Sequence, residues 1–216
     1  MWQRNQTNAL EKRVQQLQHY IPVLELQRTQ LIYDESQDMW AVVVEYCEKF
    51  RYGVKSEDGH QYSDQLEFLR SSMVQDVALG EHCGVQELMD WWRRYSSVFK
   101  DLQLQPKCMQ RVSEGFMRVS AILSVTVSVF TLEKVFPNLK TVSLLSKLLG
   151  RRLRLPCCLW FEWDASSSRV VRVEMTVNYV TAMMKVFGNL SVVASVLAHA
   201  HITRYGGVQV CVASDS

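Results

Sequence analysis

Leucine recurs at every seventh position near the start of the chain, and this spacing is the strongest constraint on its fold. The β-branched residues Val14 and Ile21 stand four residues after the first two leucines. Leucine at position d of a heptad and β-branched residues at position a favour a parallel two-stranded coiled coil. The sequence therefore predicts a dimerisation helix whose contacts come from Leu10, Val14, Leu17, Ile21, Leu24, Arg28 and Leu31.

Two residues disturb this heptad seam. Arg28 stands at an a position, where two like charges would face each other in a homodimer, so a partner with an acidic residue there is preferred. Pro22 lies at an outward position but costs about 3 kcal/mol in a helix interior, which predicts a kink or short break after Ile21. Because the seam has four leucine positions, packing of this helix on its own domain stays open as the alternative.

Beyond Leu31 the apolar stripe restarts out of phase, at Met39, Val43, Cys47 and Phe50. We expect the coiled coil to end there and the helix to enter a globular domain, ending near residues 52–53. The predicted organisation is a leucine-zipper helix over 1–53, an α+β domain over 60–205 and a flexible tail over 206–216.

Composition sets wider limits on the class of protein. With 216 residues and 48% hydrophobic content, the chain can bury one core and is not a disordered tail. Its net charge of +2 gives no support for nucleic-acid binding. No stretch reaches the roughly 18 apolar residues of a membrane span and the N-terminus has no apolar signal core, so we expect a soluble protein with no membrane partner.

The cysteines and histidines do not form a metal-binding pattern. No two cysteines form a CxxC pair, which argues against zinc and favours reduced core thiols in an intracellular protein. His199 and His201 have the wrong spacing for one helical face and no third ligand, so no metal or other cofactor is expected. The six cysteines are Cys47, Cys83, Cys108, Cys157, Cys158 and Cys211.

The rest of the chain predicts an α+β fold. Amphipathic spacing is followed by two-residue alternation of apolar and polar side chains, which is typical of half-buried strands. The last two strands flank a turn-rich segment and should form an antiparallel hairpin, and Pro156 predicts an edge or bulge position. The expected helices are 64–79, 85–100, 180–187 and 190–199, and the expected strands are 119–129, 153–163 and 171–177.

Several charged residues are candidates for ion pairs or for acid–base catalysis. Glu162 and Arg172 are expected to pair across the hairpin as a structural contact worth about 0.2 to 1 kcal/mol. His82 and Asp90 are the strongest acid–base pair that the sequence offers, against a solvated helix-end histidine as the favoured interpretation. Because no nucleophile with a neighbouring base is found, we expect no enzymatic activity.

Two basic clusters have ordinary structural explanations. Residues 91–94, Trp-Trp-Arg-Arg, could stack on a nucleobase or a partner, but one buried Trp with both Arg in solvent is favoured. Arg151, Arg152 and Arg154 form the densest basic run, which is more typical of solubility or protection of a sheet edge than of a phosphate site.

Five segments along the chain share a resemblance to one family: QRNQTNALEKRVQQLQ, LELQRTQLIYDESQDMWAVVVEYCEKFRYG, DVALGEHCGVQELMDWWRRYSSVF, LSVTVSVFTLEKVFPNL and GRRLRLPCCLWFEWDASSSRVVRVEM. They resemble the basic leucine-zipper (bZIP) transcription factors of oomycetes. The resemblance implies a nuclear regulator that forms a homo- or heterodimer with another bZIP protein. In that family the basic segment ends about where Arg4 stands here, and the base-reading residues would fall before Met1, so Arg4 alone is carried over as a weak DNA contact.

Charge supports the loss of the basic segment. Residues 1–53 contain six Lys or Arg and seven Asp or Glu, a net charge of −1, whereas a DNA-reading arm is several charges positive. Either the start codon lies further upstream or the chain is a truncated member that dimerises without binding DNA itself, so DNA would be reached through the partner or an upstream segment.

The order of elements in the second domain is similar to the cone of the nuclear transport factor 2 and polyketide-cyclase (NTF2/SnoaL-like) superfamily. Such cones hold a pocket or bury a face in a dimer, and enzymes among them place an acid or base and a His in the cavity. The leading hypothesis is a bZIP-type transcription regulator that acts as a dimer; the alternative is a small-molecule-binding or enzymatic cone domain.

Overall fold

The computed structural model describes residue 14 and residues 37–55, 59–137, 139, 141–203 and 205–209. The chain divides into two units, residues 1–41 and 42–216. Val14 is helical and about half exposed, while the other residues of the predicted seam, and Arg4, lie outside the described residues. Residues 42–216 contain the whole sheet and helices α3–α8.

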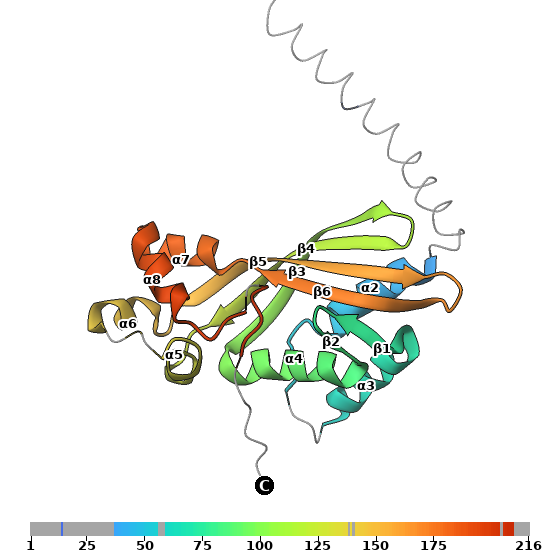
Figure 1. The fold of residues 1–216 in the computed structure, drawn as a ribbon, viewed down its shortest axis with the longest axis horizontal. Helices are drawn as coiled ribbons and strands as arrows, with labels where there is room; N and C mark the ends of the chain where they lie inside the picture. The colour runs from blue at the N-terminus through green and yellow to red at the C-terminus, as the bar shows by residue number, and fades with distance from the viewer. Residues whose placement is uncertain are drawn as a thin grey trace, which may run out of the picture. The chain divides into compact units, whose positions relative to one another are not determined.

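Six strands form one curved sheet (Figure 1) with the spatial order β2-β1-β6-β5-β4-β3. Neighbouring strands are antiparallel, except for the parallel pair of β1 and β6. β3 is therefore an edge strand and β5 a central one. The strands are β1 (Met73–Leu79), β2 (His82–Cys83), β3 (Lys100–Ser113), β4 (Phe116–Thr126), β5 (Arg152–Asp164) and β6 (Arg169–Val177).

The helices gather in two places. In Figure 1, α4 runs along one face of the sheet near α3, whereas α5, α6, α7 and α8 lie together at one end of it. The mixed α+β architecture with a curved sheet agrees with the sequence prediction. The helices are α2 (Gln37–Lys49), α3 (His60–Ser72), α4 (Val85–Val98), α5 (Val129–Val135), α6 (Val142–Leu148), α7 (Tyr179–Phe187) and α8 (Leu190–Ala198).

The alternation of side chains gives the sheet two chemically different faces. In β5 the buried Leu153 and Leu155 alternate with the exposed Arg152 and Arg154. Successive side chains of a strand point to opposite faces, so the leucines define an inner face under the helices and the arginines an outer face. Antiparallel pairing of β4 with β5 sets Ser124 opposite Arg154, so β4 divides its side chains in the same way.

The predicted hairpin of β5 and β6 is confirmed. The two strands pair antiparallel from Cys157 opposite Val177 to Asp164 opposite Arg169. The Asp164 carboxylate accepts hydrogen bonds from the backbone and hydroxyl groups of Ser166 and Ser167, which fixes the turn and lowers the pKa of Asp164 to about 2.

The predicted ion pair is formed, whereas Pro156 lies in a central strand and not at the edge or bulge position that the sequence predicted. Glu162 accepts a hydrogen bond of 3.0 Å from Arg172 Nε. Pro156 has a ladder partner in β4 but stands beyond the last residue pair of β5 and β6, so its missing N–H leaves no pair of that ladder broken. β5 itself is central, however, so the basic run at its start does not protect a sheet edge.

Several elements differ from the sequence prediction, and β2, α5 and α6 were not predicted at all. The expected helix over 64–79 ends at Ser72, and the remainder is β1, because Met73 and Val77 are fully buried beside β6. β3 was missed because its sequence is polar and contains Pro106, features that count against a strand when its partner is unknown. The strand expected to reach 129 ends at Thr126, since Ser128 and Thr131 form a capping box that starts α5.

A buried amide joins α2 to α3. Gln65 is 1% exposed, and its Nε2 donates to the carbonyl of Lys49 at 2.7 Å and to that of Gly53 at 2.9 Å. Lys49 is the last residue of α2 and Gly53 follows it, and backbone acceptors at a helix end have no partner within the helix. Gln65 of α3 therefore supplies the hydrogen-bond donor for two backbone carbonyls at the end of α2.

Candidate functional site

The space between the helices and the inner face is filled by aromatic side chains. Trp92 of α4 and Tyr46 of α2 are buried, and Trp92 Nε1 donates to the Tyr46 hydroxyl at 2.7 Å. Phe50 stacks on Trp92 with ring centroids 5.4 Å apart, and Tyr46 meets Phe161 of β5 edge to face at 5.2 Å. Burial raises the pKa of Tyr46, so its hydroxyl stays neutral and acts as a structural hydrogen-bond partner.

Two further tyrosines, Tyr95 and Tyr179, are buried in the same interior. The hydroxyls of Tyr95 and Tyr179 lie 3.1 Å apart, and Tyr95 also donates to the Gly206 carbonyl. Burial, and then the nearby Tyr179, raise the pKa of Tyr95. Among the residues that the structure describes, no carboxylate or histidine is buried, so the acid or base and the His expected of a cone enzyme are not found in this interior.

The acid–base pair weighed from the sequence is not formed. His82 is exposed on the short strand β2, while Asp90 of α4 binds Arg93 at 3.0 Å. His199 and His201 are also exposed and contact separate backbone carbonyls. Within the described ranges, no group of three or more His, Cys, Asp or Glu side chains could hold a metal ion.

The predicted basic-aromatic cluster of α4 is structural. Trp92 is fully buried, as expected, and Trp91 stacks on Tyr95 with ring centroids 4.4 Å apart. Arg93 and Arg94 are half-buried and form ion pairs with Asp90 and Glu87. These guanidinium groups are therefore engaged within α4.

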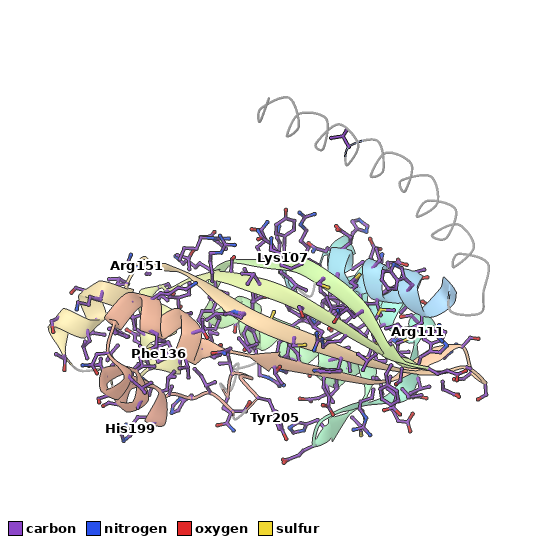
Figure 2. All side chains as sticks on the ribbon, turned by 90° about the horizontal axis from the view of Figure 1, so that it is seen from above. Lys107, Arg111, Phe136, Arg151, His199 and Tyr205 are labelled. Atoms are coloured by element: carbon purple, nitrogen blue, oxygen red, sulfur yellow. The ribbon has the colours of Figure 1, made fainter. Side chains whose placement is uncertain are left out.

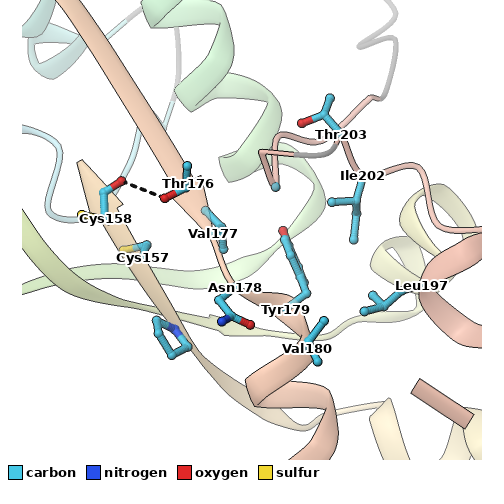
Figure 3. Close-up of a pocket in the computed structure, with 12 residues that line it drawn as sticks. Cys157, Cys158, Thr176, Val177, Asn178, Tyr179, Val180, Leu197, Ile202 and Thr203 are labelled. Atoms are coloured by element: carbon cyan, nitrogen blue, oxygen red, sulfur yellow. Dashed lines mark hydrogen bonds between the residues drawn. The ribbon is translucent and has the colours of Figure 1, made fainter. Parts of the chain in front are cut away.

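An open groove of about 670 Å³ lies where β5 and β6 meet α7, α8 and the C-terminal segment (Figure 3). Its polar groups are largely occupied: Thr176 Oγ1 donates to the Cys158 carbonyl at 3.5 Å, and the Asn178 side chain caps α7. Burial raises the pKa of the Cys157 thiol to about 12, which keeps it protonated and unreactive at neutral pH. The walls include Pro156, Cys158, Thr176, Tyr179, Leu197 and Ile202.

The outer face of the sheet is the other candidate surface. Arg152 and Arg154 are exposed there, in a central strand, whereas the sequence predicted a role in solubility or in protecting a sheet edge. The signal that was missed is local charge: residues 100–154 contain ten Lys or Arg and three Asp or Glu, a net charge of +7, which the acidic remainder at −5 hides in the total of +2. Figure 2 is seen from above and labels further basic residues, Lys107 and Arg111 in β3 and Arg151 ahead of β5; Arg111 is opposite the buried Met117 and so does not belong to the outer face.

Comparison with protein families gives one informative match. Residues 40–98 match the family model described as the BZIP transcription factor 1 C-terminal domain. The matched segment starts within α2 and ends at the last residue of α4, so it contains α3, β1, β2 and the aromatic residues Tyr46, Phe50, Trp92 and Tyr95. Comparison with curated protein sequences gives no significant match.

Several solved structures share part of this arrangement. A SnoaL-like polyketide cyclase from Agrobacterium tumefaciens is 11% identical with a TM-score of 0.47, covering 67% of this chain and 93% of its own. IdmH, a putative polyketide cyclase from Streptomyces antibioticus, is 13% identical with a TM-score of 0.46, covering 67% and 95%. A putative SnoaL-like polyketide cyclase from Shewanella putrefaciens is 11% identical with a TM-score of 0.47, covering 70% and 96%.

Among the residues that the structure describes, no helix is both long and apolar enough to cross a bilayer.

Proposed function

We propose that this chain is a transcription-regulatory protein of the basic-zipper type, which works in the nucleus as a dimer formed by the heptad seam of residues 10–31. The observation that carries the proposal is the match of residues 40–98 to a bZIP transcription factor C-terminal domain, which begins nine residues after Leu31. A leucine-zipper pattern and a domain found in zipper transcription factors thus follow one another along the chain.

The partner in this proposal is a second zipper helix. Arg28 at an a position disfavours a symmetric homodimer, so a bZIP protein with an acidic residue at that level is the preferred partner. The basic segment of such a partner would read the bases of DNA in the major groove. The α+β domain would then act as the interaction module of the complex, without catalytic activity.

Sedimentation equilibrium of the full chain tests the dimer. We expect self-association, or association with a bZIP partner, that weakens when Leu17 and Leu24 are both changed to Asn. Replacing one buried leucine costs about 2 to 5 kcal/mol, so each change should raise the dissociation constant by at least about 30-fold. Leu26→Asn removes the same side chain from an outward heptad position and is the matched control. Equal weakening by the control would refute the seam.

The groove beside Tyr179 favours a second candidate function, the binding of a small apolar molecule. Its volume of about 670 Å³ falls within the range of small-molecule sites, which is roughly 300 to 1,000 Å³. Native mass spectrometry of the purified chain would detect a bound molecule as a mass adduct. The adduct should be lost in Val180→Trp, which fills the groove, and kept in Val129→Trp, which alters an exposed valine of α5.

A further inference from the structure

We propose that the outer face of the sheet over β3, β4 and the start of β5 binds the phosphate backbone of duplex DNA. The choice of DNA over other polyanions rests on the proposed function, whereas the cationic site rests on the structure alone. We call this surface the cationic sheet face, and its residues are Lys100, Gln103, Arg118, Thr126, Arg152 and Arg154.

Strand register gathers these cations from distant parts of the sequence. Lys100 is opposite Thr126, which is opposite Arg152, so the three residues form one row across β3, β4 and β5. The next row joins Gln103, Ser124 and Arg154 in the same way. Neighbouring strands lie about 4.7 to 4.9 Å apart and alternate residues of one strand about 6.6 Å apart, so three cationic side chains start within roughly 12 Å of one another.

These cations have no acidic partners among the described residues. None of the nine described Lys and Arg residues between 100 and 154 forms an ion pair, whereas five of the nine described elsewhere do. On the outer face Glu162 and Glu174 both bind Arg172; Glu174 shares a row with Arg118, at the end of the sheet away from Arg152 and Arg154. Like charges close together repel, so an anion that neutralises them would be bound favourably.

The Arg152 side chain is held in place by neutral groups. Its guanidinium donates to the Asp101 carbonyl at 3.1 Å and to the Gln103 amide oxygen at 3.4 Å, and both acceptors leave its positive charge uncompensated. A guanidinium group that is already oriented loses less conformational entropy when it meets a phosphate. Near the start of β4, away from Arg152, the Arg118 guanidinium lies 5.6 Å from the centre of the Trp160 ring and donates to the Gln110 amide oxygen.

The surroundings of the cations favour DNA over a lipid surface. A protein that binds anionic membranes adds exposed apolar side chains to its basic ones. No large apolar residue is exposed between Arg118 and Thr126 in β4 or in β5, and the exposed Val112 and Phe116 lie beyond Arg118, at the end of the sheet away from Arg152 and Arg154. The half-buried polar neighbours Gln103 and Thr126 are of the residue types that make the hydrogen bonds to phosphate and sugar that position proteins on DNA, whereas Ser124 is buried.

The test is fluorescence anisotropy of a labelled 20-base-pair duplex with the full chain, between 20 and 200 mM NaCl. Each phosphate neutralised contributes about −0.9 to the slope of log K against log salt, so contacts from Lys100, Arg118, Arg152 and Arg154 predict about −3.6. The double variant Arg152→Gln and Arg154→Gln should lower this to about −1.8 and weaken binding about 60-fold at 100 mM salt. Both side chains are exposed, so the variant should keep the melting temperature of the wild type.

The matched control is the double variant Lys55→Gln and Lys185→Gln, which removes the same charge from two exposed lysines elsewhere. The proposal holds if the arginine variant loses affinity and salt dependence as predicted while the control binds DNA like the wild type. It is overturned if no binding occurs at 20 mM salt, if the control loses as much affinity, or if the chain binds phosphatidylserine vesicles through these arginines and not DNA. The zipper variant Leu17→Asn with Leu24→Asn separates the two proposals, since each monomer keeps its cationic sheet face when dimerisation fails.

Discussion

The hydrogen bond between Trp92 and Tyr46 should stabilise the domain by an amount that one small substitution can measure. Tyr46→Phe removes the hydroxyl that accepts from Trp92 Nε1 at 2.7 Å, in a site where both side chains are buried. A buried donor left without an acceptor costs about 1 to 3 kcal/mol. For a domain of this size 1 kcal/mol shifts Tm by about 2 to 4 °C, so we expect a fall of about 2 to 12 °C.

The assay is thermal unfolding followed by circular dichroism, with Tyr62→Phe as the matched control. Tyr62 also accepts a hydrogen bond, from Gln86 at 3.1 Å, but at an exposed position where water replaces the lost group. The control should change stability by less than about 0.5 kcal/mol. Equal Tm values for the two variants would refute the reasoning, because they would show that the Trp92 N–H does not depend on the Tyr46 hydroxyl for its hydrogen bond.

Three further predictions concern the α+β domain. Gln65→Ala should destabilise it by about 1 to 3 kcal/mol in urea unfolding, because two carbonyls at the end of α2 lose their buried donor; an unchanged midpoint would contradict this. In the native protein a thiol reagent should label the exposed Cys108 and not the buried Cys157, as peptide mapping by mass spectrometry would show; equal labelling would mean that β5 is not packed. Asp164→Ala should lower Tm at neutral pH, and the difference from wild type should be full above about pH 4 and vanish as pH falls towards 2, because the pKa of Asp164 is lowered in the folded state; a difference that persists at pH 2 would contradict the carboxylate's role.

Periodicity predicted the elements whose burial is decided locally. The alternating residues of β4, β5 and β6 and the apolar faces of α4, α7 and α8 stand almost where the pattern placed them. β1 was missed because its conformation depends on a strand distant in sequence, since Met73 pairs with Val170. β3 was missed although β4 follows it directly, because its own sequence is polar and contains Pro106. A short apolar run or a polar strand gives no local sign of such a neighbour.

The candidate surfaces divide in the same way. One buried Trp in α4 and the Glu162–Arg172 pair follow from residue type and spacing, and the sequence predicted both. The cationic sheet face did not follow, because Lys100 and Arg152 are 52 positions apart and meet only through the register of three strands. The total charge also conceals it, since an acidic remainder balances the basic segment between 100 and 154.

Disulfide formation across the predicted seam measures parallel dimerisation most directly. Residues at the same d position face each other in a parallel coiled coil, and a disulfide forms when two Cβ atoms lie about 3.5 to 4.5 Å apart. Leu24→Cys should therefore give a covalent dimer on mild oxidation, seen on a non-reducing gel, whereas Leu26→Cys at its outward position should match the wild type. The same amount of dimer from both variants, or none above wild type from Leu24→Cys, would contradict a zipper dimer of this chain with itself; repeating the experiment with a cysteine-bearing bZIP partner would then decide whether the seam pairs at all.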